Sequence, residues 1–81
     1  MNDDEYPRWE FHGGNGKNRK WRSYIREHCE LLEAAFELRV GRVAFTIDDW
    51  AYEVDLVNMS QTSLTTSAIR LVRRLTGPPA M

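Results

Sequence analysis

The sequence predicts an α+β domain in which a curled antiparallel sheet packs against a single helix. The helical pattern is confined to one stretch, residues 25–36, where apolar residues recur every three or four positions. Several other stretches alternate apolar and polar residues, as half-buried strands do. Segments rich in glycine, serine or threonine separate these stretches and suit turns. A sheet and a helix that each have one apolar face must cover one another, which gives the expected architecture.

The first two strands are expected to form a hairpin. Residues 9–11 can start a strand just after Pro7, and residues 21–24 suit the returning strand. Between them, residues 12–16 read His-Gly-Gly-Asn-Gly, and glycine tolerates the positive φ angles that tight turns require.

The helix follows this hairpin directly. Its apolar stripe consists of Ile25, Cys29, Leu32 and Phe36. Four glutamates fall off the stripe and are expected in solvent: Glu27, Glu30, Glu33 and Glu37. Gly41 lies where a glycine would end the helix, because that position often adopts a left-handed conformation.

Alternating residues then predict a second hairpin. Residues 43–47 read as a strand, and Asp48-Asp49 can turn the chain. The next strand places four apolar side chains on one face, namely Trp50, Tyr52, Val54 and Leu56.

The last part of the chain predicts two further strands. Residues 56–64 can form one that carries Met59, a core residue, and Gln61 on a common face. Residues 60–67 are rich in serine and threonine, which favours a loop or a hairpin over a helix. Residues 69–75 alternate again and place Arg70, Val72 and Arg74 on one side.

Length and composition indicate one small globular domain of ordinary composition. The 81 residues are 42% hydrophobic and 28% charged, and they contain no apolar run of membrane-spanning length. We divide them into an acidic leader (1–7), a folded domain (8–75) and a C-terminal tail (76–81). The leader lacks the apolar run of a signal peptide, and the single cysteine indicates a reducing compartment. The nucleus, the cytoplasm or both are therefore expected, with no membrane partner.

Charge is distributed unevenly although the formal net charge is only −1. All twelve acidic residues lie at or before Asp55, and residues 17–26 hold five cations and no acid. Two local basic patches in a near-neutral protein fit a small anionic ligand better than a long nucleic acid, which needs a broad basic face. An RNA-binding surface built from residues 17–26 is the weaker alternative.

Aromatic residues and their spacing resemble those of the WWE domain. The resemblance rests on Trp9-Glu10, on Trp21 with Tyr24, on the block 52–56, on Met59 and Gln61, and on the Arg-x-Val-Arg-Arg run at 70–74. It implies a half-barrel of about six strands with one helix across it. Characterised members bind poly(ADP-ribose) through iso-ADP-ribose, others are thought to take terminal ADP-ribose, and most lie within ubiquitin ligases or ADP-ribosyltransferases.

The resemblance also implies a ligand pocket at the open end of the half-barrel. Carried over position by position, its residues are Phe11, Trp21, Tyr52, Gln61 and Arg70. Tyr52 and Gln61 stand nine residues apart, as the family's pocket tyrosine and glutamine do. The chain departs from the family at Gly14, where some high-affinity members carry arginine, and at residues 17–20, which form an insertion.

Each of these residue types has a physical role in such a pocket. Aromatic rings can stack on adenine, and an amide can both donate to and accept from the edge of the base. An arginine can bind pyrophosphate oxygens bidentately, which lysine does less well. Structural roles remain open beside these: Trp9 and Trp21 as core residues, Gln61 as a surface amide, and Arg70 as a solvated charge.

Catalysis is not expected from this chain, and neither a metal nor a cofactor is implied. His28 and Cys29 are neighbours on a helix, so their side chains point about 100° apart. Cys29 lies on the apolar stripe, where a structural thiol is expected. Two hypotheses remain, a reader of ADP-ribose units on modified proteins and a protein-protein interaction module without a nucleotide ligand.

Overall fold

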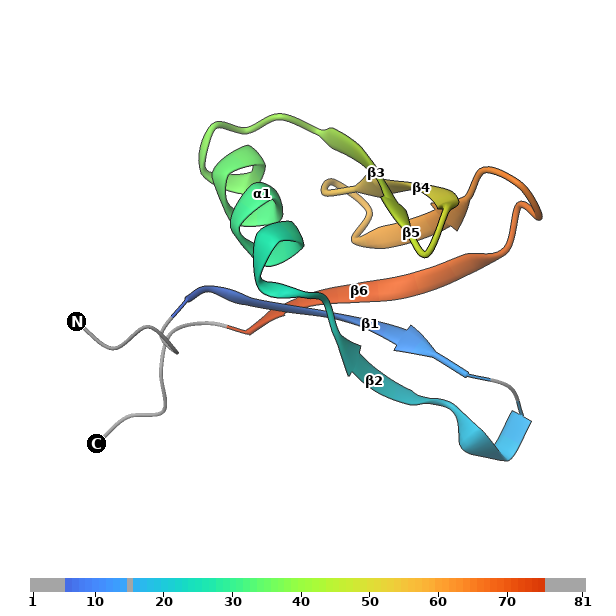
Figure 1. The fold of residues 1–81 in the computed structure, drawn as a ribbon. Coiled ribbons are helices and arrows are strands. Elements are labelled where there is room, and N and C mark those ends of the chain that lie inside the picture. Colours follow the sequence, from blue (N-terminus) through green and yellow to red (C-terminus); the bar gives the residue numbers. More distant parts are fainter. Residues whose placement is uncertain (1–5, 15, 76–81) are drawn as a thin grey trace, which may run out of the picture.

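The computed structural model describes residues 6–14 and 16–75, which form one antiparallel sheet and one α-helix (Figure 1). The strands are β1 (Arg8–Gly13), β2 (Lys20–Ser23), β3 (Arg42–Ile47), β4 (Trp50–Asp55), β5 (Ser60–Ser63) and β6 (Ile69–Leu75). A short 3-10 turn, η1 (Gly16–Asn18), precedes β2, and the helix α1 spans Arg26–Glu37. The acidic leader up to Glu5 and the tail from residue 76 lie outside the described residues.

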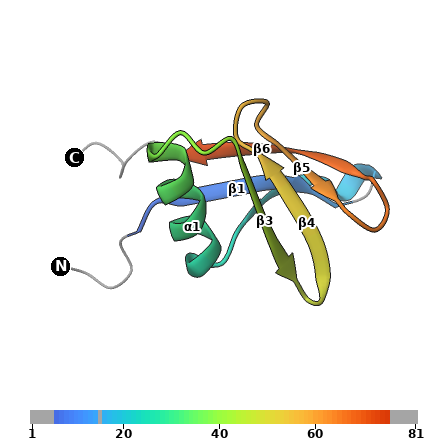
Figure 2. The same ribbon diagram turned by 90° about the horizontal axis from the view of Figure 1, so that it is seen from above.

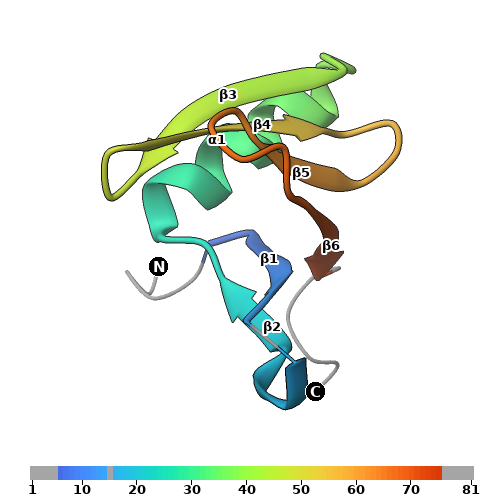
Figure 3. The same ribbon diagram turned by 90° about the vertical axis from the view of Figure 1, so that its right-hand side faces the viewer.

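The sheet is open and curled, with strand order β2-β1-β6-β5-β4-β3. The first and last strands along the chain, β1 and β6, pair with each other inside the sheet, with Trp9 opposite Arg74 and Phe11 opposite Val72. The sheet bends so that β3 and β4 lie above β1 and β2, with α1 between them at one end (Figures 2 and 3). The predicted α+β fold of six strands and one helix is therefore confirmed.

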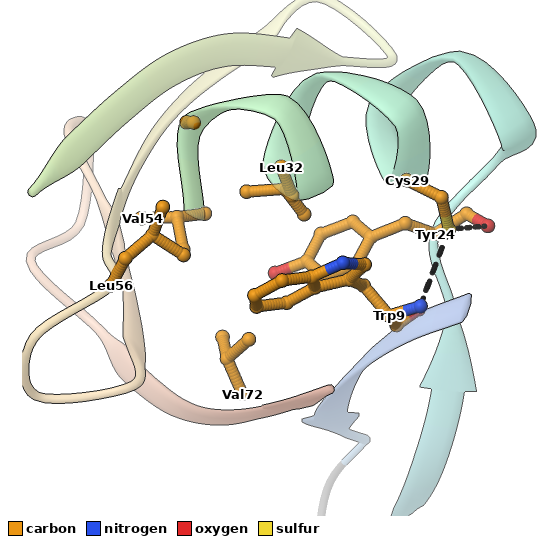
Figure 4. Close-up of a cluster of buried hydrophobic side chains, with 8 residues drawn as sticks. Trp9, Tyr24, Cys29, Leu32, Val54, Leu56 and Val72 are labelled. Carbon is orange, nitrogen blue, oxygen red and sulfur yellow. Dashed lines mark hydrogen bonds between the residues drawn. The ribbon is translucent and has the colours of Figure 1, made fainter. Parts of the chain in front are cut away.

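The core lies where α1 crosses the concave face of the sheet (Figure 4). Its buried members are Trp9, Tyr24, Cys29, Leu32, Ala35, Val54, Leu56 and Val72. Cys29 and Leu32 of the predicted stripe are fully buried, Phe36 is partly exposed but packs edge-on against Trp9, and Ile25 is 60% exposed. Ile25 lies outside the stripe because it is the N-cap residue and has an extended backbone.

Cys29 has a structural role in this core. Its Sγ accepts a hydrogen bond from the Trp9 backbone N–H at 3.4 Å and donates to the Tyr24 carbonyl, also at 3.4 Å (Figure 4). Burial raises the pKa of the Cys29 thiol, which opposes formation of a reactive thiolate. Cys29 therefore ties the start of the helix to the first hairpin.

Glu33 is not exposed to solvent, and the sequence prediction for this residue is wrong. Its side chain is only 13% exposed and accepts hydrogen bonds from the Trp9 indole N–H and from Nε of Arg74, both at 2.9 Å. The Arg74 guanidinium also donates from Nη2 to the second carboxylate oxygen at 2.6 Å. A buried indole and an arginine beneath the helix both need an acceptor, and Glu33 serves both.

The helix ends earlier than predicted. Arg39, not Gly41, adopts the left-handed conformation after the last turn, with φ of 60°. The backbone N–H of Val40 bonds to the carbonyl of Ala35 at 2.8 Å, as in a Schellman motif. Gly41 lies two residues beyond this cap, where its carbonyl accepts a hydrogen bond from Leu56.

The later turns agree with the sequence at one point and differ at another. Asp48 and Asp49 both have positive φ and join β3 to β4, as predicted. Residues 56–59 form a turn, whereas a strand over 56–64 was predicted. An Asp55 carboxylate oxygen accepts the backbone N–H groups of residues 57 and 58, and Met59 has φ of 54°. The predicted strand is therefore confined to β5, and residues 60–67 form part of the β5–β6 hairpin.

Candidate functional site

A pocket opens on the concave face, at the end of the sheet that lies away from the helix. Its volume is about 370 Å³, within the range of small-molecule sites. The lining residues are Phe11, Gly13, Gly14, Arg22, Trp50, Tyr52, Gln61, Ser63, Thr66, Ala68 and Arg70. In Figure 1, α1 lies at the left, while the β1–β2 turn and the β5–β6 turn both lie at the right.

Strand register explains why residues distant in sequence meet here. Gln61 pairs with Arg70 across β5 and β6, and Tyr52 pairs with Ser63 across β4 and β5. Directly paired residues share a face of the sheet, so these side chains point into the same concavity. Phe11 reaches it from β1. The structure thus brings together Phe11, Tyr52, Gln61 and Arg70 of the predicted site.

Trp21 is not brought to this pocket. It pairs with His12, one position away from the pocket-lining pair of Phe11 and Arg22, and strand alternation turns it to the opposite face. There its ring lies 5.1 Å from the His12 ring and 4.2 Å from the Arg73 guanidinium carbon. The geometry does not support a ligand contact from Trp21, which packs on the outer surface of the β1–β2 hairpin.

Arg22 and Trp50 line the pocket although the sequence did not single them out. Arg22 belongs to a run of cations, and only the register of β2 shows which of them faces the concavity. A Cβ at Gly13 would lie 3.0 Å from the Phe11 ring and 3.2 Å from Cδ of Arg22. The glycine therefore allows an aromatic ring and a guanidinium side chain to lie close together at the pocket wall.

Gly14 is required by the turn that follows β1. Its φ is +104°, and a Cβ there would lie 2.5 Å from the carbonyl oxygen of Asn18. An arginine at position 14, as some WWE domains have, is incompatible with this backbone. On the pocket wall, the neighbouring cation is Arg22.

Gln61 is fixed at the boundary between pocket and core. It is only 3% exposed, and its Oε1 accepts a hydrogen bond from the Tyr24 hydroxyl at 2.7 Å. Burial raises the pKa of Tyr24 well above its ordinary value, so this hydroxyl keeps its proton. The Gln61 amide nitrogen has no partner among the described residues, which leaves an N–H donor for a ligand.

The electrostatics of the pocket are set by two arginines. Neither Arg22 nor Arg70 has a carboxylate partner within the part of the chain that the structure describes. Arg73 and Arg74, a few residues further along β6, are instead paired with Glu10 and Glu33 at 2.6 Å. The pocket is therefore a site of uncompensated positive charge, suited to an anion.

An open half-barrel with one helix across it and an aromatic, basic pocket defines a small binding module. The chain matches the family model described as WWE domain over residues 7–74, and it therefore belongs to the WWE family. A search of curated proteins gave no match. In residues 6–14 and 16–75, no helix is long and apolar enough to cross a membrane, and no cluster of three potential metal ligands occurs.

Proposed function

We propose that the pocket binds one ADP-ribose unit of poly(ADP-ribose), as iso-ADP-ribose or as the terminal unit. The observation that carries this proposal is the convergence of aromatic rings, one amide and two unpaired arginines in a single cavity of about 370 Å³. An adenine nucleotide presents the complementary features: a flat base with hydrogen-bonding edges and negatively charged phosphates.

The aromatic side of the pocket suits the base. Trp50 and Tyr52 stand two apart on β4 and share its concave face, and Trp50 is 49% exposed. Stacking on an aromatic ring contributes roughly 1–3 kcal/mol per base in single-strand binders. The Gln61 N–H donor can reach a ring nitrogen of adenine, which would give selectivity for the base.

The basic side of the pocket suits the phosphates. Arg70 lies directly opposite Gln61, and Arg22 lines the wall beside Phe11. A guanidinium offers a planar set of donors that matches phosphate oxygens. Two arginines from different strands can therefore hold the ligand's phosphate groups while the base occupies the aromatic side.

In this proposal the domain recruits rather than catalyses. It would bring a larger protein, a ubiquitin ligase or an ADP-ribosyltransferase by the family resemblance, to ADP-ribosylated targets in the nucleus or cytoplasm. A module that binds without modifying its ligand needs only a pocket of this kind and a connection to a catalytic domain.

Calorimetric titration with iso-ADP-ribose, ADP-ribose and AMP tests the proposal. We expect a Kd in the micromolar range, about −8 kcal/mol. Arg70→Ala should weaken binding by about 2 kcal/mol, on the order of thirtyfold, because a charge-assisted contact is lost, and Arg70→Lys should restore part of it. Arg39→Ala, which removes an exposed charge at the helix end, is the matched control and should bind normally.

Two results would contradict the proposal. The absence of heat and of amide shifts at millimolar ligand would leave the pocket without a nucleotide, and a protein-protein interaction module would be the remaining function. Equal affinity in wild type and Arg70→Ala would place the phosphates elsewhere on the surface.

A further inference from the structure

A second concavity lies on the β1–β2 hairpin, next to the pocket. Its volume is about 550 Å³, and it is lined by Lys17, Asn18, Arg19, Lys20 and Arg22. Arg22 lines both cavities, so the two lie next to each other at this side chain. Lys20 stands two residues before Arg22 on β2 and therefore points to the same face of the sheet.

The cations of this second concavity are unpaired. None of Lys17, Arg19 and Lys20 forms a salt bridge among the described residues, and all three are exposed. Elsewhere on the described chain, four arginines do have carboxylate partners: Arg26, Arg42, Arg73 and Arg74. Uncompensated positive charge is thus concentrated on the pocket and on the hairpin beside it.

The position of the hairpin extends this charge beyond the pocket mouth. The turn that contains η1 projects below the pocket end of the sheet (Figures 1 and 3). Gly14 lets η1 fold back, with the Asn18 carbonyl within 2.5 Å of where a Cβ would lie. The hairpin therefore presents a row of cations that starts at the pocket wall and leads away from it.

We infer that the β1–β2 hairpin is a second subsite, which binds the pyrophosphate of the neighbouring unit when poly(ADP-ribose) occupies the pocket. This inference rests on the proposed function of the pocket. A single ADP-ribose unit occupies the first cavity, whereas a polymer continues past Arg22. Its next pyrophosphate then contacts Lys17 and Lys20. Phosphate contacts of this type contribute affinity without base selectivity and depend strongly on salt. The domain then prefers an internal or penultimate unit of a chain over the free monomer.

The test compares iso-ADP-ribose with short poly(ADP-ribose) oligomers of defined length, for wild type and for Lys17→Ala/Lys20→Ala. Both lysines are exposed and lie outside the first pocket, so the variant should fold normally, which a melting curve verifies. We expect wild type to bind the oligomers more tightly than the monomer. The double variant should lose on the order of tenfold for the oligomers and nothing for iso-ADP-ribose.

Salt dependence gives a second readout. The slope of log K against log salt for the oligomers should decrease by about 1.4 in the double variant, at roughly 0.7 per phosphate contact. Arg39→Ala removes one exposed cation just after the helix, away from both cavities, and is the control. We expect it to change neither the affinity for the oligomers nor the salt slope.

The two proposals fail in different ways. If wild type binds neither iso-ADP-ribose nor ADP-ribose, the proposed function fails and the subsite fails with it. If wild type binds iso-ADP-ribose but the double variant binds oligomers as wild type does, or weakens monomer and oligomers equally, only the subsite is overturned. Binding of single-stranded polyadenylate that depends on the lysines but not on Arg70 would assign the hairpin to RNA and also overturn the subsite.

Discussion

The two ends of the curled sheet are built from the same strands and differ in how their polar groups are satisfied. On β1, Trp9 is fully buried under the helix, while Phe11, two residues later, lines the pocket. On β6, Arg74 is bound to Glu33, while Arg70, on the same face, has no carboxylate partner in the described residues. One strand pair thus supplies both a closed core and an open site.

The difference shows which charges serve the fold and which remain for a ligand. At the helix end the Arg74 guanidinium lowers the pKa of the Glu33 carboxyl, and the pair neutralises itself. At the pocket end Arg22 and Arg70 stay uncompensated and therefore retain affinity for an anion. Substitutions at the two ends should therefore separate into effects on folding and effects on binding.

The largest expected effect is that of Trp9→Ala at the helix end. Removing this fully buried indole should lower the free energy of unfolding by about 4 kcal/mol, because a cavity replaces the centre of the core. Trp50→Ala at the pocket end is the matched control. Since Trp50 is 49% exposed, its loss should cost about 1 kcal/mol or less while weakening ligand binding. Urea denaturation measures both, and equal costs would contradict the division between the two ends.

Glu33→Gln tests the salt bridge that distinguishes Arg74 from Arg70. We expect a loss of about 2 kcal/mol of stability at pH 7, because the charge-assisted bonds to Arg74 weaken, and unchanged ligand affinity. Glu30→Gln is the control, since the pair that Glu30 forms with Arg26 is exposed, and should change stability by less than about 0.5 kcal/mol.

The pH dependence of stability in wild type and Glu33→Gln tests whether the charge of the Glu33 carboxylate is the cause. The pKa of Glu33 is lowered in the folded state, mainly by its hydrogen bonds to Arg74. The stabilisation is therefore complete above the ordinary glutamate pKa, about 4.3, and is lost as the pH falls through the lower folded value. Wild type and Glu33→Gln should converge in stability at acidic pH. A difference that persists unchanged at low pH would mean that the carboxylate charge is not the cause.

Much of the fold could be predicted because its signals are local. The helical stripe around Cys29 and Leu32 and the Asp48-Asp49 turn each depend on a few neighbouring residues. The helix end was misplaced since Arg39 occupies a left-handed position that usually takes glycine. Glu33 was misassigned to solvent because its partner Arg74 is distant in sequence.

The residues of the site also fall into two groups, those that the sequence predicts and those that only the strand pairing assigns. Tyr52, Gln61 and Arg70 could be predicted from spacing and family resemblance, and they meet in one cavity. Trp21 and Arg22 are neighbours on β2, and no periodicity in so short a strand shows which of them faces inward. Only the pairing of β2 with β1 decides this, and it assigns Arg22 to the pocket and Trp21 to the outer face.

The smallest expected effects lie at the boundary between the two ends, where Tyr24 bonds to Gln61. A surface amide at position 61, the structural role that the sequence left open, could be truncated with little loss of stability. The 3% exposure of Gln61 instead predicts a loss of about 1–2 kcal/mol of stability, because the buried Tyr24 hydroxyl loses its acceptor. Tyr24→Phe removes the other partner and should cost about 1 kcal/mol.

Both variants should also weaken the binding of iso-ADP-ribose. Gln61→Ala removes the amide donor, and Tyr24→Phe removes the hydrogen bond that holds the Gln61 amide in its orientation. Melting curves and titrations on both variants measure these effects, and normal binding by a destabilised Gln61→Ala would make Gln61 a purely structural residue.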